Sequence, residues 1–276
     1  MVILKMSRKK NLIVILIWMQ VLLMLFVSTV YGGLGVKGAT IEADVAPGEH
    51  FSQDIIVYLT ETNSSVDILA DVMGYGQPSQ GGSFEIPPED DRSNYTARPF
   101  LTVTPASFRL EPGQEQTLTV QGDIPSDVGA GGRYAIVNIH TKPIGNGTVG
   151  ISLAINIPVR LGIVGTERIM TGEIEDISLE KPVSPIRQNA TLEFKNTGNY
   201  HYQVKMDATM SNEEGTVLAT VSQPVSYSPV LPTSARIIDF SFLPDKALVP
   251  GNYNIHASVT LEDGTPLASK EINFKV

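Results

Sequence analysis

The residue types that most often carry out chemistry are few in this sequence and are not grouped. Its four histidines, His50, His140, His201 and His256, are scattered, and none belongs to a His-Glu-x-x-His pair, the spacing that holds catalytic zinc. A Gly-x-Ser-x-Gly nucleophile turn and a phosphate-binding glycine loop are also absent from the 276 residues. Because the chain has no cysteine, a thiol nucleophile and a Cys-ligated zinc are excluded. The sequence therefore predicts a non-enzymatic protein without a cofactor or a metal centre.

One acidic loop offers oxygen ligands of the kind that Ca²⁺ takes. Glu89, Asp90 and Asp91 are consecutive, and Asn94 follows closely. The cluster lacks the regular alternating ligands of a dedicated calcium loop, so a solvated loop is the favoured interpretation.

The stretch around this loop, Gly74–Arg98, is rich in Gly, Pro, Ser and Gln and is expected to be the longest irregular segment after residue 40. Recognition often resides in long loops held by a rigid β-scaffold. Tyr75, Phe84 and Tyr95 are therefore candidates for partner contact, with local packing of these rings as the alternative.

Four Asn-x-Ser/Thr sequons start at Asn63, Asn94, Asn146 and Asn189. They are candidate N-glycosylation sites if the protein is exported in an organism that glycosylates.

The elements that must hold these residues are β-strands. After residue 40 the apolar pattern has a period of two, the segments are rich in β-branched residues, and Pro, Gly, Asn and Asp separate them. Strands are expected at 40–45, 53–59, 66–73, 100–103, 107–110, 116–122, 133–141 and 149–164, and then at 172–179, 190–196, 201–210, 217–224, 235–242, 253–261 and 267–275. The fold class is all-β. Seven strands in the second half match an immunoglobulin-like sandwich, and residues 40–168 and 169–276 are expected to form two such β-sandwich domains.

The first 39 residues are predicted to form a signal peptide or an N-terminal membrane anchor. Lys5, Arg8, Lys9 and Lys10 precede an apolar run, which directs the rest of the chain out of the cytoplasm. The small residues before Gly33 favour cleavage, whereas a run close to the roughly 20 residues that span a bilayer favours retention. Both outcomes stay open, so the protein is secreted or held on the outer face of a membrane.

The exported part is acidic. Residues 1–39 hold five of the 20 Lys and Arg residues and none of the 29 Asp and Glu residues, so the remainder has a formal charge of −14. This charge disfavours nucleic acid and anionic lipid surfaces as partners.

Five segments carry a resemblance to a known family. The segments similar to the amino-terminal domain of periplasmic pilus-assembly chaperones are Thr104–Gln114, Gln116–Val120, Ile124–Pro125, Gly131–Ile139 and Ile155–Leu161. They look still more like surface proteins with a chaperone-like sandwich and a second β-domain, including those that interact with WxL-domain partners. The resemblance covers roughly residues 40–165.

This resemblance implies a place for one basic residue. The chaperone family binds a subunit's carboxylate with an Arg on the first strand and a Lys on the last strand of that domain. Arg160 takes the Lys position, but the first strand, Thr40–Asp44, has two acids and no Arg. Arg160 is a candidate partner-binding residue, and an ordinary paired strand residue is the alternative.

The favoured function is a non-enzymatic cell-surface protein that makes contacts with envelope proteins or cell-wall polymer through its β-sandwich surfaces. The alternative is an assembly chaperone for surface subunits that acts by strand donation.

Overall fold

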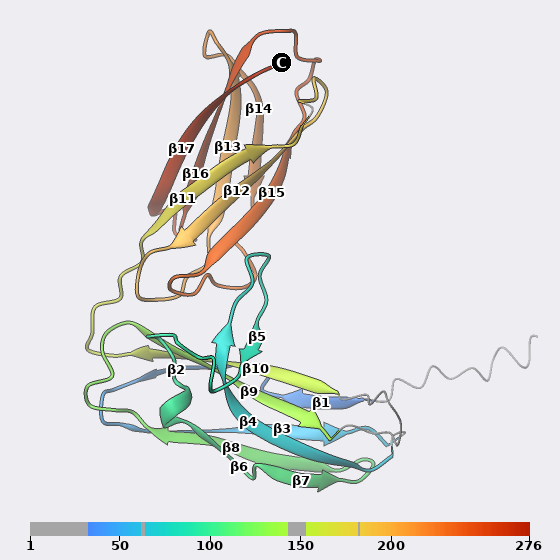
Figure 1. Ribbon diagram of the computed structural model, residues 1–276, viewed down its shortest axis with the longest axis vertical. Helices are drawn as coiled ribbons and strands as arrows, with labels where there is room; N and C mark the ends of the chain where they lie inside the picture. Colours follow the sequence, from blue (N-terminus) through green and yellow to red (C-terminus); the bar gives the residue numbers. More distant parts are fainter. Residues whose placement is uncertain (1–32, 62–63, 143–152, 182) are drawn as a thin grey trace, which may run out of the picture.

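The computed structural model describes residues 33–61, 64–142, 153–181 and 183–276 (Figure 1). The described residues form β-strands and one short 3₁₀ turn, η1 (Arg98–Phe100). The strands build two β-sandwiches that follow one another along the long axis of the molecule. Among the described residues, no helix has the length and hydropathy to cross a bilayer.

The first sandwich has two sheets. One sheet has the order β1-β3-β8-β6, and the other has the order β2-β10-β9-β4, with β5 and β7 also pairing with β4. The strands are β1 (Leu34–Lys37), β2 (Ile41–Val45), β3 (His50–Leu59), β4 (Val66–Gly76), β5 (Phe84–Ile86), β6 (Thr102–Thr104), β7 (Ser107–Leu110), β8 (Glu115–Asp123), β9 (Gly132–Thr141) and β10 (Ala154–Ile163).

Alternation along the strands places the first core between these two sheets. Ile55 and Val57 of β3 are 1% and 0% exposed and face Val137 and Val159 of the opposite sheet within one hydrophobic cluster. The intervening side chains point away from the core, as the period of two requires.

The strand β9 is buried on both faces, which its sequence did not indicate. Ala135 and Val137 fill the core, while Tyr134 and Ile136 on the other face are only 3% and 0% exposed. The mixed outer face predicted for this strand is therefore covered by other parts of the chain. This outer surface is where the second sandwich approaches.

The second sandwich pairs a sheet of order β11-β12-β15 with a sheet of order β14-β13-β16-β17 around a separate hydrophobic cluster. Its strands are β11 (Gly172–Leu179), β12 (Gln188–Asn196), β13 (Lys205–Asn212), β14 (Val217–Gln223), β15 (Ala235–Phe242), β16 (Asn252–Thr260) and β17 (Pro266–Lys275). Phe194 and Phe242 are fully buried in this core.

Three segments differ from the sequence-based expectation. Residues 34–37, placed in the leader, form β1, which pairs with β3. The stretch Gly74–Arg98 is not wholly irregular, because β4 extends to Gly76 and β5 pairs with that extension in a hairpin. The strand expected from His201 begins only at Lys205, since the preceding residues contact the first sandwich. Of the segment expected at 149–164, residues 149–152 lie outside the described residues.

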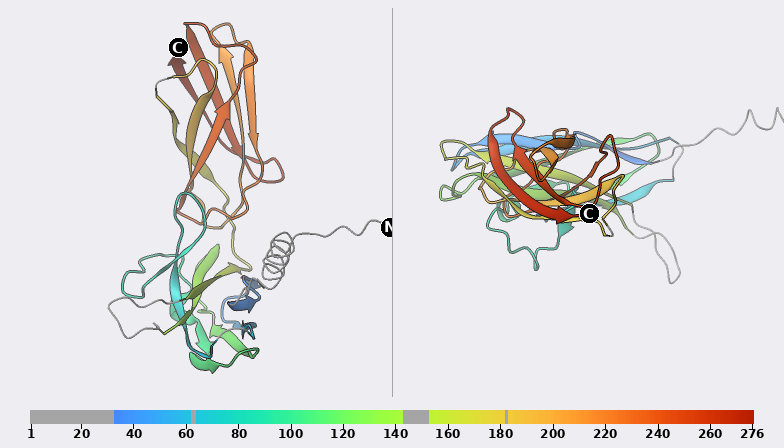
Figure 2. Two further views of the ribbon diagram at one scale, coloured as in Figure 1. Left: turned by 90° about the vertical axis from the view of Figure 1, so that its right-hand side faces the viewer. Right: turned by 90° about the horizontal axis from the view of Figure 1, so that it is seen from above.

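The hairpin of β4 and β5 joins the two sandwiches. Its tip reaches from the first sandwich to the near end of the second (Figures 1 and 2). Gln77 makes two hydrogen bonds there, donating through Nε2 to Pro229 O at 2.8 Å and accepting from Leu231 N at 3.0 Å. Ile237 N on the β15 edge donates to Ser79 O at 2.8 Å. These bonds hold the hairpin against the second sandwich.

Candidate functional site

Four side chains on neighbouring strands form a polar row on the outer face of the β2-β10-β9-β4 sheet. Arg160 of β10 is in register with Glu42 of β2 on one side and Tyr134 of β9 on the other. Tyr75 of β4 extends the row, and its ring meets Tyr134 edge to face at 6.3 Å between centroids. Register on one face therefore brings a carboxylate, a guanidinium and two phenols together.

Within the polar row, Arg160 is already paired. Its Nη2 donates to Glu42 Oε2 at 3.1 Å, and only 14% of its side chain is exposed, against 54% for Glu42. The Nε atom is buried without a hydrogen-bond partner. Burial raises the pKa of Tyr75, and the nearby Arg160 guanidinium opposes this increase. The positive charge of Arg160 is thus balanced by Glu42 within the protein.

His201 closes the row from the second sandwich. Its Nε2 lies 3.1 Å from Glu42 Oε1, and its Nδ1 lies 3.2 Å from the Tyr134 hydroxyl. Tyr200 stacks on the imidazole with centroids 4.3 Å apart. Burial lowers the pKa of His201 more than the hydrogen bond to Glu42 raises it, so the ring is neutral at pH 7. In that state Nε2–H donates to Glu42, and Nδ1 accepts from Tyr134.

Glu42 is the ionised member of this group. Burial raises its pKa, but the hydrogen bonds and charges of Arg160 and His201 outweigh burial and hold the pKa of Glu42 below its ordinary value. The Glu42 carboxylate therefore accepts one hydrogen bond from the first sandwich, from Arg160, and one from the second, from His201.

We expect the free energy of unfolding to fall in mild acid because of His201. As pH drops below about 6.5, the unfolded histidine binds a proton, whereas the folded imidazole with its lowered pKa stays neutral. The unfolded state then binds more protons, so stability is full above this pH and declines below it. Urea unfolding at pH 7.5 and 5.5 measures the decline, which should be smaller in His201→Gln. The other histidines are present in both proteins and cancel, so an equal decline would contradict the assignment.

A second set of contacts lies beside the row. Arg168 hydrogen-bonds Asp44 and lies over the Tyr200 ring, 4.6 Å from its centroid. Gly132 N donates to Asn199 O at 2.9 Å. Together with the polar row and the hairpin, these contacts fix the two sandwiches against each other.

The strand β10 has one free edge. Its carboxy-terminal half pairs with β2 over Val159–Ile163, but among the described residues nothing pairs with the corresponding edge of Ala154–Pro158. Thr141 N of β9 donates to Leu153 O, and Val164 N donates to Val45 O at the end of β2, so odd-numbered residues of β10 bond towards β9. The backbone groups of Ala154 and Asn156, and the Pro158 carbonyl, therefore point outwards.

Side chains suited to an added strand flank this edge. Leu153 is 52% exposed, and Ile155 is half-buried at the margin of the core. Pro158 costs the sheet no hydrogen bond, because its missing N–H would point away from β9. The edge Ala154–Pro158 thus offers unpaired backbone groups next to apolar surface.

The structure brings together two of the four residues expected to contact a partner. Arg160 and Tyr75 share the polar row, whereas the Phe84 ring lies 48% exposed against Gly76 within the hairpin. Tyr95 lies under the Arg133 guanidinium, 5.8 Å from the ring centroid, and its carbonyl accepts from Tyr134 N at 2.8 Å. Sequence reasoning missed His201 and Tyr134, which no local spacing connects.

Two of the four sequon asparagines can be placed. Asn94 is exposed in a turn. Asn189 lies in β12, where it donates to Glu180 Oε2 and accepts from Ser241 Oγ. Asn63 and Asn146 lie outside the described residues. Glycosylation of all four stays a prediction.

The acidic loop is solvated at Glu89 and Asp90, as expected, but not at Asp91. Only 1% of the Asp91 side chain is exposed. Its carboxylate accepts from Ser93 N at 3.2 Å and Thr96 Oγ1 at 2.6 Å, and it lies 3.6 Å from Arg98 Nε. Asp91 therefore organises its own loop. No group of three or more His, Asp or Glu residues is arranged for a metal ion within the described ranges.

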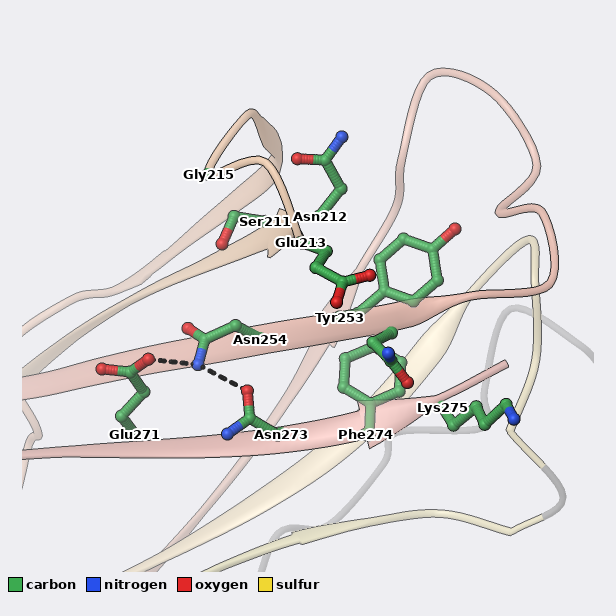
Figure 3. Close-up of a pocket in the computed structure, with 11 residues that line it drawn as sticks. Ser211, Asn212, Glu213, Gly215, Tyr253, Asn254, Glu271, Asn273, Phe274 and Lys275 are labelled. Atoms are coloured by element: carbon green, nitrogen blue, oxygen red, sulfur yellow. Dashed lines mark hydrogen bonds between the residues drawn. The ribbon is translucent and has the colours of Figure 1, made fainter.

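The second sandwich also has a large open hollow at the end farther from the row, about 740 Å³ in volume (Figure 3). Three polar side chains of its lining already hydrogen-bond to one another, because Asn254 Nδ2 donates to Glu271 and to Asn273. The Tyr253 ring stacks on Phe274 and is 5% exposed, so it does not present a free face.

Comparison with known proteins gives structural neighbours only. No family model matches this chain. No curated protein matches it either. Among solved structures it is similar to the Escherichia coli chaperone DraB, with 13% identity over 89% of this chain and 98% of that chain and a TM-score of 0.39. The class 5 fimbriae chaperone CfaA gives 14% identity, 88% and 98% coverage and a TM-score of 0.42. A protein of unknown function from Porphyromonas gingivalis W83 gives 14% identity, 88% and 99% coverage and a TM-score of 0.32.

Proposed function

We propose that this chain is an exported, non-enzymatic protein that binds a surface subunit by pairing a strand of that subunit with the free edge of β10. It would act as an assembly chaperone, the second of the two functions left open by the sequence. The observation that carries the proposal is the edge Ala154–Pro158, with which no strand of the described residues pairs. An exposed edge is a ready template for another strand, and natural proteins usually cover or charge such edges.

The chemistry of this edge suits strand addition. Backbone hydrogen bonds to Ala154 and Asn156 would supply affinity, while Leu153 and Ile155 would meet alternate apolar side chains of the partner. The edge segment itself carries no charged side chain. Export is supported by the basic and apolar start of the sequence, which lies outside the described residues.

One observation favours the other candidate, a structural cell-surface protein that contacts envelope proteins or wall polymer. The basic residue that the chaperone resemblance points to, Arg160, is occupied by Glu42 and is mostly buried. A partner carboxylate would have to displace Glu42 before it could bind. If strand addition alone supplies the affinity, Arg160→Gln should leave partner binding within about threefold.

Capture of partners from intact envelopes tests the proposal, using the full chain and its Ala154→Pro and Ala154→Ser variants. Proline at this position removes an outward N–H and leaves the bonds to β9 intact. We expect a captured surface subunit to be lost, by tenfold or more, with Ala154→Pro and retained with Ala154→Ser. Equal capture by all three proteins would favour the structural role, with its contact elsewhere.

A further inference from the structure

One buried charge in the second sandwich lacks an acidic partner. Arg236 of β15 is 8% exposed, and no Asp or Glu of the described residues forms a salt bridge with it. Its Nη2 donates to Ser228 Oγ at 3.0 Å and to the Ser228 and Pro229 carbonyls at 3.4 Å. Its Nε is buried without any partner. Buried charges in proteins are normally paired, so this guanidinium is incompletely satisfied.

Another buried arginine shows what full satisfaction looks like. Arg133, which is 7% exposed, also lacks an acid but bonds to three carbonyls through both terminal nitrogens, and it lies over the Tyr95 ring. Arg236 makes its carbonyl bonds through Nη2 alone. Its Nη1 lies against Gly81, where an added Cβ would be only 2.3 Å away. The Gly81 backbone, with φ of 95°, leaves room there that a side chain would fill.

Arg236 also lines a cavity of about 470 Å³ where the hairpin tip meets the second sandwich. Pro224, Val225 and Ile238 supply accessible apolar walls, and Ser226 adds a hydroxyl. Arg236 is the cationic group of this concave, mostly apolar space, and Asp239 is its anionic group. Ligand sites commonly combine apolar walls with a few charged or polar groups.

We propose that this cavity binds an organic carboxylate attached to an apolar group, with Arg236 as its anion-binding residue. The guanidinium fork matches a carboxylate, and the apolar walls would cover the rest of the ligand. Three other titratable side chains are near, and one of them, Tyr227, is fully exposed at the cavity. Tyr75 stays neutral because burial raises its pKa, and Asp239, at the cavity rim, accepts from Thr191 Oγ1 at 2.7 Å. This cavity shares no residue with the β10 edge, so carboxylate binding does not depend on strand addition.

Titration calorimetry with the full chain tests carboxylate binding at Arg236. The two ligands are isovalerate, a free aliphatic acid, and N-acetylleucine, an amino-acid carboxylate. Isovaleramide and N-acetylleucinamide keep the apolar groups without the charge. We expect saturable binding of at least one acid, at least tenfold weaker binding of its amide, and slower amide exchange at Gly81 and Ser228 on binding. The acid that binds more tightly shows whether the site takes a free aliphatic acid or the carboxylate of an amino acid.

Variants locate the site. Arg236→Met should weaken acid binding at least tenfold, while Arg187→Met, which removes an exposed arginine of the same sandwich, should leave it unchanged. Arg236→Lys keeps the charge without the fork and should weaken binding less, and it serves as the test if the methionine variant does not fold. The proposal is wrong if neither acid binds at millimolar concentration, if the amides bind equally well, or if the Arg236 variants bind as tightly as the wild type.

Discussion

Phe194→Ala is expected to lower the free energy of unfolding of the second sandwich by about 3–5 kcal/mol. The Phe194 ring is completely buried, lies edge to face with Tyr202 at 6.4 Å between centroids, and covers Gly172 so closely that an added Cβ would be 2.1 Å from it. The neighbours therefore cannot collapse easily into the space that the ring leaves. Urea unfolding followed by hydrogen exchange in each sandwich measures the loss.

The matched variant in the first sandwich is Ile157→Ala, for which we expect a loss of about 2–5 kcal/mol from the other core. We propose that the two sandwiches are separate domains that meet at residues 168 and 169, with β1 included in the first, because the two hydrophobic clusters share no member. Each variant should then destabilise chiefly its own sandwich. If both variants lower the stability of both sandwiches equally, the chain is a single cooperative unit.

Ile155→Pro is expected to destabilise the first sandwich by about 3 kcal/mol or more. The Ile155 N–H points to β9, so proline removes a ladder bond opposite Ile139 and also loses a half-buried apolar side chain. Ala154→Pro, one residue earlier, removes an N–H that points outwards and should change stability by no more than about 0.5 kcal/mol. Chemical denaturation of the two variants measures this difference.

The difference in stability between Ala154→Pro and Ile155→Pro tests which backbone N–H groups of β10 point towards β9. Equal destabilisation by both prolines would mean that Ala154 also bonds within the protein, and the edge would not be free.

Much of the fold could be predicted from alternation. Strands such as β7, β11 and β15 have the predicted bounds, because apolar and polar residues are interspersed along each of them between turn residues. The elements that were missed are short. β1 and β5 have four and three residues, too few for a period of two to be visible, and they become strands only by pairing with β3 and β4.

The site was predicted only in part because register and long-range contact create it. The resemblance singled out Arg160, and the acids of the first strand were noted, but the sequence could not show that parallel pairing sets Glu42 beside Arg160. His201 and Tyr134 are 67 residues apart and meet only because the sandwiches pack together. Alternation along β10 indicated a strand, whereas its free edge follows from how far β2 extends.

Amide hydrogen exchange with the captured subunit bound reports whether a strand of that subunit adds to the edge of β10. In the free protein, the Ala154 and Asn156 amides should exchange quickly, and those of Ile155 and Ile157, bonded to β9, should exchange slowly. On binding, Ala154 and Asn156 should become protected by tenfold or more while Ile155 and Ile157 change little. Binding that leaves the Ala154 and Asn156 amides unprotected would mean that the subunit does not pair with this edge.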